Sequence, residues 1–163
     1  MCQVDWNKLR DEVHEWSLLN FGKQPSEYRI LGLHEEQGEL CRVVLKRRQA
    51  IRDEQSRFDD EWDAIGDIAI YLMDYCGAEE VDIIAPLEDK SSLIIDNILN
   101  DLASWTSYLA GNIPKQIVVT QILALLNSYC NIQEINFESA VESTWKGVGA
   151  RDWKLYPKNG VSK

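Results

Sequence analysis

Two short clusters of carboxylates carry the most distinctive chemistry of the chain. They are Glu35-Glu36-Gln37-Gly38-Glu39 and Asp63-Ala64-Ile65-Gly66-Asp67. Residues three or four apart project from one patch of a helix, so each cluster presents its acidic groups together. Glu36 also lies three residues after Leu33 and four before Leu40, on an apolar stripe. A carboxylate in such surroundings needs a compensating charge.

Two facing acidic helices would form a cation site whose ligands are all oxygen atoms. Oxygen ligands without His or Cys favour magnesium, with manganese as a substitute. A di-iron bundle would need Glu-x-x-His pairs, which His14 and His34 do not supply. The competing interpretation is a solvated acidic face, which is common in a chain with 27 acidic residues. The position of Glu36 on an apolar stripe favours the cation site.

Length and composition predict a single domain that spans residues 1–163. A chain of 163 residues with 45% hydrophobic content can bury one sizeable core. We find neither an apolar stretch of roughly 18 residues nor a signal-peptide pattern, so we expect a cytoplasmic protein without a membrane partner. The formal net charge of −10 disfavours nucleic acid as a partner. The four cysteines form no Cys-x-x-Cys pair and predict neither a disulfide framework nor a zinc site.

Helical spacing dominates the sequence and predicts an all-α fold. The expected helices run from Asp5 to Gly22, from Ser26 to about Ile51, from Asp59 or Asp60 to Gly77, from Ser91 or Ser92 to Gly111, from Pro114 onward, and from Asn136 to Lys146. The second helix is expected to turn Ile51 inward. Residues 147–163 form a C-terminal arm. Glycines at 32, 38 and 66 inside helices predict close helix approach or room for a ligand.

A short internal similarity pairs Tyr75-Cys76 with Tyr129-Cys130, and each pair is followed at the same separation by related residues. Under that alignment Asp63 and Asp67 correspond to Ile117 and Gln121. The similarity is either a duplicated helical hairpin whose second copy has lost its carboxylates or a chance match.

The order and spacing of the two acidic clusters resemble the Glu-Glu-x-x-Glu and Glu-x-x-Asp motifs of the MazG-like, all-α nucleoside triphosphate pyrophosphohydrolases. Trp16 and Asn20-Phe21 also fit that group, so the resemblance covers residues 5–76, the expected metal-binding helices. The Asp-Ala-Ile-Gly-Asp form is similar to that of small members, including those carried by phages. The resemblance implies a MazG-like, four-helix-bundle-like fold with extra C-terminal helices, and the host cytoplasm for a phage-encoded protein.

The resemblance also implies a set of site residues. The implied magnesium ligands are Glu36, Glu39, Asp63 and Asp67. The family's Glu in Glu-x-x-Asp falls on Ala64 here, and Asp63, one turn before Asp67, could supply the missing oxygen. Glu35 matches an acidic neighbour that orients or activates water, and Glu35 or Glu36 would accept its proton. The expected substrate-binding residues are Trp16, Asn20, Lys46, Arg47, Arg151 and Lys154.

The implied reaction is magnesium-dependent hydrolysis of a nucleoside or deoxynucleoside triphosphate to the monophosphate and pyrophosphate. The phage-like motif suggests a purine deoxynucleotide such as dGTP. Proteins of this kind are homodimers or homotetramers, and residues 91–146 offer an apolar surface for assembly, which includes Trp105, Ile117, Val118, Ile122 and Leu126. Two alternatives stay open. One is another metal-dependent phosphohydrolase, acting on phosphoribosyl-ATP or a dinucleoside polyphosphate, and the other is a non-catalytic helical interaction protein with a decayed site.

Overall fold

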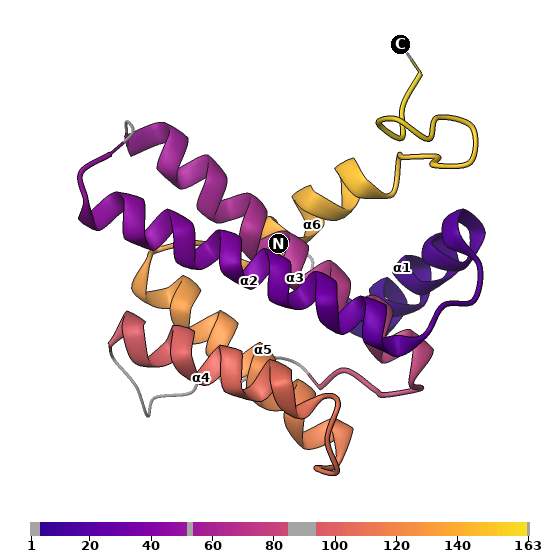
Figure 1. Cartoon of the computed structure of the whole chain (residues 1–163), viewed down its shortest axis with the longest axis horizontal. Helices are drawn as coiled ribbons and strands as arrows, with labels where there is room; N and C mark the ends of the chain where they lie inside the picture. The colour runs from indigo at the N-terminus through magenta and orange to yellow at the C-terminus, as the bar shows by residue number, and fades with distance from the viewer. Residues whose placement is uncertain (1–3, 52–53, 85–93, 163) are drawn as a thin grey trace.

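The computed structural model describes residues 4–51, 54–84 and 94–162, except for the side chains of 54–57. Over these ranges the chain forms six helices and no strand, which confirms the all-α prediction. The helices are α1 (Trp6–Phe21), α2 (Ser26–Arg48), α3 (Glu54–Ala78), α4 (Ile95–Tyr108), α5 (Lys115–Ile132) and α6 (Phe137–Val148) (Figure 1). No helix within the described ranges is both long enough and apolar enough to cross a membrane.

Helix α3 lies at the centre of the molecule and packs against α1, α2, α5 and α6. Between Ala64 and Cys76, every residue of α3 is buried except Asp67 and Tyr71, which are half-buried. A helix that is apolar on nearly all sides is one that other elements surround. Of the carboxylates of α3, Glu61, Asp67 and Asp74 therefore lie at helix interfaces, whereas Asp59 and Asp63 are exposed.

Helices α4 and α5 form a hairpin that packs on the face of α2 and α3 away from α1 (Figure 1). Gln37 of α2 is buried and donates a hydrogen bond from Nε2 to the backbone oxygen of Leu99 at 3.2 Å. Glu61 of α3 is completely buried and accepts hydrogen bonds from the Arg47 guanidinium and the Tyr129 hydroxyl. The charge of Glu61 is thus compensated where three helices meet.

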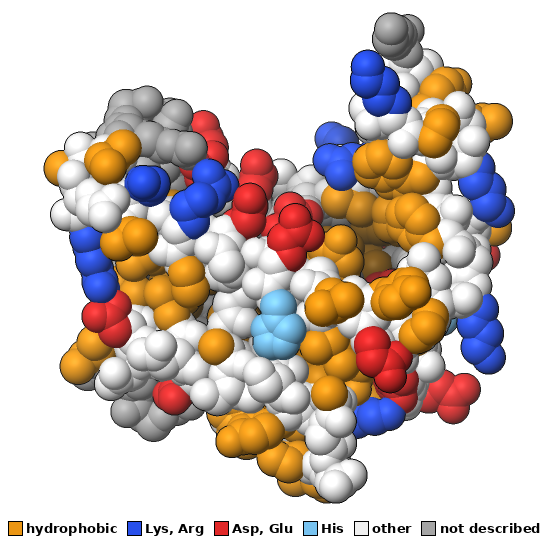
Figure 2. All heavy atoms as spheres, viewed as in Figure 1, with side chains coloured by type: hydrophobic (Ala, Val, Ile, Leu, Met, Phe, Trp, Pro, Cys, Tyr) orange, Lys and Arg blue, Asp and Glu red, His pale blue; other side chains and the backbone are white. Residues whose placement is uncertain are grey.

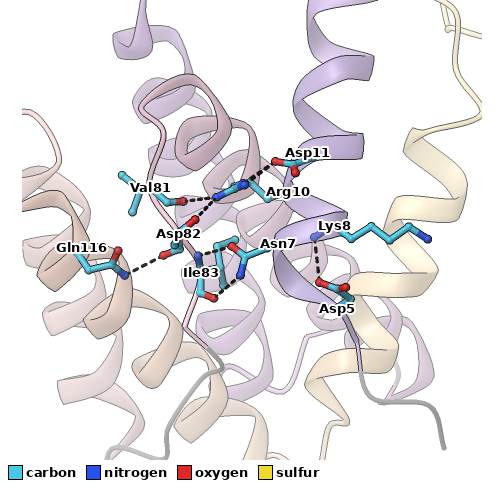
Figure 3. Close-up of polar contacts among 9 residues, drawn as sticks. All are labelled: Asp5, Asn7, Lys8, Arg10, Asp11, Val81, Asp82, Ile83 and Gln116. Carbon is cyan, nitrogen blue, oxygen red and sulfur yellow. Dashed lines mark hydrogen bonds and ion pairs between the residues drawn. The ribbon is translucent and has the colours of Figure 1, made fainter.

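The first helix is tied to the segment that follows α3 (Figure 3). The side-chain amide of Asn7 donates to the backbone oxygen of Ile83 at 3.1 Å and accepts from its backbone nitrogen at 2.8 Å. Arg10 donates to the backbone oxygen of Val81 at 3.1 Å and to Asp82 Oδ1 at 2.9 Å. Gln116 of α5 donates to the backbone oxygen of Asp82 at 2.9 Å. These bonds hold α1 to the segment that follows α3. One face of α1 thereby packs toward the centre of the molecule.

Several helix boundaries differ from the sequence predictions. Helix α3 begins at Glu54, before the predicted caps Asp59 and Asp60, which lie inside the helix. Helix α4 begins at Ile95 and ends at Tyr108 instead of Gly111, while Ser91 and Ser92 lie outside the described residues. Ile51 follows the end of α2, where Ala50 adopts a φ of 54°, and it is 45% exposed instead of turned inward as predicted.

The predicted assembly surface on α4 and α5 is also corrected. Val118, Ile122 and Leu126 are fully buried in the core of this same chain, where the α4–α5 hairpin packs inward. Ile117 is 50% exposed, and Trp105 is half-buried. Three of the five residues therefore stabilise the monomer and are not accessible to a second copy.

The internal similarity corresponds to a repeated way of ending a helix. The backbone nitrogen of Val81 donates to the oxygen of Cys76, and that of Ile135 donates to the oxygen of Cys130, each at 2.9 Å. The residues before them, at 80 and 134, have positive φ values of 53° and 57°. This 6→1 hydrogen bond with a left-handed residue is the Schellman motif. Helix α2 ends in the same turn without the shared sequence, since the backbone nitrogen of Ile51 donates to the oxygen of Lys46 at 3.0 Å and Ala50 has a φ of 54°, so the turn is not specific to the similarity.

Gly32 and Gly66 allow close packing of helices, whereas Gly38 has no close neighbour. A Cβ atom at Gly32 would overlap the ring of Tyr71 on α3, and one at Gly66 would overlap Thr144 on α6. Gly38 has no neighbouring atom within 4 Å of a Cβ position. Close helix approach is thus the reason for Gly32 and Gly66.

Substitution of Gly32 and Gly38 by Ala should therefore change stability in opposite directions. Gly32→Ala should lower the free energy of unfolding by about 1–3 kcal/mol, because the Tyr71 ring has to shift. Gly38→Ala on the same helix should raise it by up to about 1 kcal/mol, because alanine favours the helix over glycine. Urea denaturation of the two variants measures both changes. Equal effects would contradict the close approach of α2 and α3 at Gly32.

Candidate functional site

A pocket of about 380 Å³ lies where α1, α2 and α3 meet the C-terminal arm, defined here as residues 149–162. This volume falls within the range of small-molecule sites. Figure 2 shows acidic side chains gathered beside a hydrophobic hollow below the arm. The pocket therefore combines an apolar wall with a charged edge.

Each helix contributes one face to the pocket. The lining residues recur at three-, four- or seven-residue spacing and are Val13, Trp16 and Ser17 of α1, Arg29 and Glu36 of α2, and Asp67, Ile70, Tyr71 and Asp74 of α3. Residues at this spacing share one side of a helix. The arm adds Arg151 and Trp153, and Phe21 and Tyr28 complete the aromatic lining.

Glu36 and Asp67, one from each predicted cluster, both line this pocket. Burial, together with the charges of Asp67, Glu35 and Glu39, raises the pKa of Glu36 to about 7. Burial and the charges of Asp63 and Glu39, opposed by Arg151, raise the pKa of Asp67 to about 6. Both carboxylates thus lie in surroundings with an excess of negative charge.

The other predicted acidic residues lie outside the pocket lining. Glu35, Glu39 and Asp63 are exposed, and Glu39 lies 3.3 Å from the Arg42 guanidinium. Burial and neighbouring carboxylates raise the pKa of Asp63. Across the three described ranges, no three His, Cys, Asp or Glu side chains lie close enough together to hold one metal ion. The structure therefore brings Glu36 and Asp67 together and leaves Glu39 and Asp63 at the edge.

The donor chemistry of this region fits a hard divalent cation. All its candidate ligands are carboxylate oxygens, which magnesium prefers over nitrogen or sulfur ligands. A cation between α2 and α3 would offset the repulsion from neighbouring carboxylates that, together with burial, raises the pKa of Glu36 and Asp67.

A buried charge network that the sequence did not predict lies at the floor of the pocket. Asp74 Oδ2 lies 2.7 Å from Arg29 Nε and accepts a hydrogen bond from Ser17 Oγ at 2.8 Å. Asp74 Oδ1 lies 2.7 Å from His14 Nδ1. Arg29 is 2% exposed and also donates from Nη1 to the backbone oxygen of Gln24 at 3.1 Å. This network holds α1, α2 and α3 together, and Ser17, Arg29 and Asp74 line the same pocket as Glu36 and Asp67.

The aromatic and amide residues predicted to bind a base make specific contacts with the arm. Trp16 lines the pocket and donates from Nε1 to the backbone oxygen of Arg151 at 2.9 Å. Asn20 Oδ1 accepts a hydrogen bond from the backbone nitrogen of Trp153 at 2.7 Å, and Nδ2 donates to the backbone oxygen of Trp16 at 2.9 Å. Asn20 is not part of the pocket lining, so its observed role is to hold the arm.

Of the predicted basic residues, only Arg151 lines the pocket. Lys154 is exposed on the arm, and Lys46 is half-buried near the end of α2. Arg47 contacts Glu61 and Gln133 on the side of α3 and α5. Sequence reasoning missed the lining residues Arg29, Tyr71, Asp74 and Trp153. One signal was available for Asp74, because it follows Asp67 by seven residues and so shares its helix face.

The raised pKa of Glu36 predicts how stability depends on pH. Between pH 4.5 and about 7 the folded protein retains a proton that the unfolded chain has lost. This contribution to stability is present below pH 4.5 and is lost as the pH rises through 7. Without divalent metal, Glu36→Gln should therefore become more stable relative to the wild type as the pH rises from about 5 to about 8.

Thermal unfolding of both proteins at the two pH values, with and without MgCl₂, measures this difference. Magnesium should stabilise the wild type at the higher pH and have a much smaller effect on Glu36→Gln, because a ligand that binds only the folded state raises its stability. A difference between the two proteins that is the same at both pH values would contradict the assigned environment of Glu36.

Comparison with known proteins identifies no relative: no protein-family model, curated protein or solved structure matches the chain.

Proposed function

We propose that this chain is a magnesium-dependent nucleoside triphosphate pyrophosphohydrolase of the MazG-like type, which converts a (deoxy)nucleoside triphosphate and water to the monophosphate and pyrophosphate. The observation that carries the proposal is that Glu36 and Asp67 line one pocket together with aromatic side chains and Arg151. The adjacent packing of the two acidic helices α2 and α3 supports a MazG-like bundle. The purine deoxynucleotide preference and the homodimer or homotetramer remain part of this proposal.

Four carboxylates would hold the metal, and their side chains would have to draw together on binding, because no three of them in the described ranges lie close enough to share one ion. Glu36 and Asp67 lie in the pocket, while Glu39 and Asp63 lie one turn away on the same helices and are exposed. Bound magnesium would supply charge neutralisation for the triphosphate and a water of lowered pKa. Asp63 takes the place of the family's Glu because Ala64 has no carboxylate and is buried.

The side chains around the metal ligands have distinct tasks in this proposal. Glu35 or Glu36 accepts the proton of the attacking water. The apolar wall excludes water from the base-binding side of the pocket, which strengthens the electrostatic contacts within it. The buried pair of Asp74 and Arg29 fixes the relative positions of α2 and α3, and thereby the distance between the two acidic clusters.

A substrate panel tests this function. The purified chain is incubated with each common NTP and dNTP, phosphoribosyl-ATP and diadenosine polyphosphates, with MgCl₂ or with EDTA, and the products are separated by ion-exchange chromatography. We expect monophosphate and pyrophosphate in equal amounts with magnesium, none with EDTA, and recovery on addition of magnesium or manganese. Release of orthophosphate, cleavage of only the other substrates, or no turnover of any nucleotide would overturn the proposal.

A further inference from the structure

The C-terminal arm is a folded segment that closes on itself. The backbone nitrogen of Asp152 donates to the oxygen of Gly160 at 2.7 Å, and the backbone nitrogen of Tyr156 donates to the oxygen of Asp152 at 2.9 Å. The Asp152 carboxylate accepts hydrogen bonds from the backbone nitrogens of Lys154 and Leu155 at 3.0 Å and 2.9 Å. These bonds give the arm a defined shape next to the pocket.

Two hydrogen bonds anchor the arm to α1 on either side of Asp152. Trp16 holds the backbone oxygen of Arg151, and Asn20 holds the backbone nitrogen of Trp153. These bonds engage the backbone of the arm, whereas the side chains of Arg151 and Trp153 line the pocket. Trp153 is half-buried there.

The arm also fixes the side chain of Arg151. Gly160 has a φ of +75°, and a Cβ atom on it would lie 2.8 Å from Cβ of Arg151. The end of the arm therefore packs closely on the aliphatic part of Arg151. The positive charge of Arg151 acts on Asp67, whose pKa it lowers.

The pocket contains two cationic side chains, and they differ in their partners. Arg29 is buried and paired with Asp74. Arg151 is exposed and forms no ion pair with any residue that the structure describes. Arg151 is thus the pocket cation that can bind an anionic ligand next to the carboxylates.

We propose that the C-terminal arm is the nucleotide-binding element of the site, in which the Trp153 ring stacks on the base and Arg151 binds the triphosphate. The identity of the ligand as a nucleotide rests on the proposed function. The separate roles of Trp153 and Arg151 rest on the contacts of the arm. A planar base matches a half-buried indole face, and a phosphate oxygen matches a guanidinium. Asn20 is a positioning residue, because it lies outside the pocket lining and acts through the backbone of the arm. Trp16 holds the arm in the same way and also lines the pocket.

Binding measurements with two probes separate the two roles. The probes are an α,β-methylene deoxyguanosine triphosphate, which carries base and phosphates, and inorganic tripolyphosphate, which carries phosphates alone, both titrated calorimetrically with MgCl₂. The matched variants are Trp153→Leu and Trp153→Phe, which both fill the pocket wall although only Phe offers an aromatic face. Arg151→Gln tests the cation, and Lys158→Gln is a control at an exposed lysine of the same arm outside the pocket lining.

We expect Trp153→Leu to weaken the nucleotide analogue about 10-fold and to change tripolyphosphate affinity less than about two-fold, with Trp153→Phe close to the wild type. Arg151→Gln should weaken both probes about 10-fold, and Lys158→Gln neither. Equal losses for both probes in Trp153→Leu, or unchanged nucleotide affinity, would overturn the proposal.

The same measurements distinguish this proposal from the proposed function. If the wild type binds the analogue, Trp153→Leu weakens that binding as expected, and no triphosphate is hydrolysed, the arm remains the binding element and the proposed enzyme function is wrong. If the wild type hydrolyses triphosphates but Trp153→Leu does not change the affinity for the analogue, the arm proposal is wrong and the proposed enzyme function stands. A wild type that binds neither probe would reject the arm proposal.

Discussion

Replacement of Glu36 by Gln is expected to reduce the turnover of a nucleoside triphosphate by about 100- to 1000-fold with magnesium present. Glutamine has nearly the same shape as glutamate, so packing between Leu33 and Leu40 is preserved. It lacks the negative charge that the proposed metal site needs. Initial rates of pyrophosphate release measure the effect. Asp67→Asn should give a loss of similar size, because its carboxylate lines the same pocket.

Glu12→Gln is the matched control for this prediction. Glu12 is an exposed carboxylate on α1 that lies 3.6 Å from Lys8, outside the pocket lining. Its removal should change the rate by less than about two-fold, since an exposed ion pair contributes little. Because Glu36→Gln relieves charge repulsion in the folded protein, its loss of activity should occur without a loss of thermal stability above pH 7. Full activity in Glu36→Gln would contradict the assigned role.

The second large effect is expected from Asp74→Asn, which should lower the free energy of unfolding by about 3 kcal/mol. The substitution keeps the size of the side chain but leaves the buried Arg29 guanidinium without its negative partner. Removal of one member of a buried ion pair is costly because the remaining charge stays desolvated. Urea denaturation at neutral pH gives the difference.

Asp82→Asn provides the comparison for a surface pair. Asp82 Oδ1 lies 2.9 Å from Arg10 Nη1, but the Asp82 side chain is 83% exposed. Its loss should cost less than about 1 kcal/mol. If both variants lost the same amount of stability, the burial assigned to the Asp74 network would be wrong.

The fold could be predicted from the sequence where local signals act alone. Asp5 caps α1 by accepting a hydrogen bond from the backbone nitrogen of Lys8, and Asn136 caps α6 in the same way. Both are short-range interactions that follow from residue type. The start of α3 could not be predicted, because Asp59 and Asp60 have the composition of caps but lie inside a longer helix. Residue types that favour a helix cap can also occur inside a helix that begins earlier in the chain.

The candidate site shows the same division between local and distant signals. Glu36 and Asp67 could be chosen from helical spacing and an apolar stripe. The arm could not be placed, because the bond from Trp16 to Arg151 joins positions 135 residues apart, and that from Trp153 to Asn20 joins positions 133 apart. The floor of the pocket likewise depends on Asp74 meeting Ser17 from 57 residues away. Such contacts arise from tertiary packing and leave no periodic pattern in the sequence.

The most direct test of the central claim is a ³¹P nuclear magnetic resonance time course with dGTP and MgCl₂ for the wild type and Glu36→Gln. For the wild type we expect pyrophosphate and monophosphate resonances to grow in equal amounts, and for Glu36→Gln we expect the triphosphate resonances to persist. Growth of an orthophosphate resonance, or equal rates in the two proteins, would contradict a pyrophosphohydrolase centred on Glu36 and Asp67.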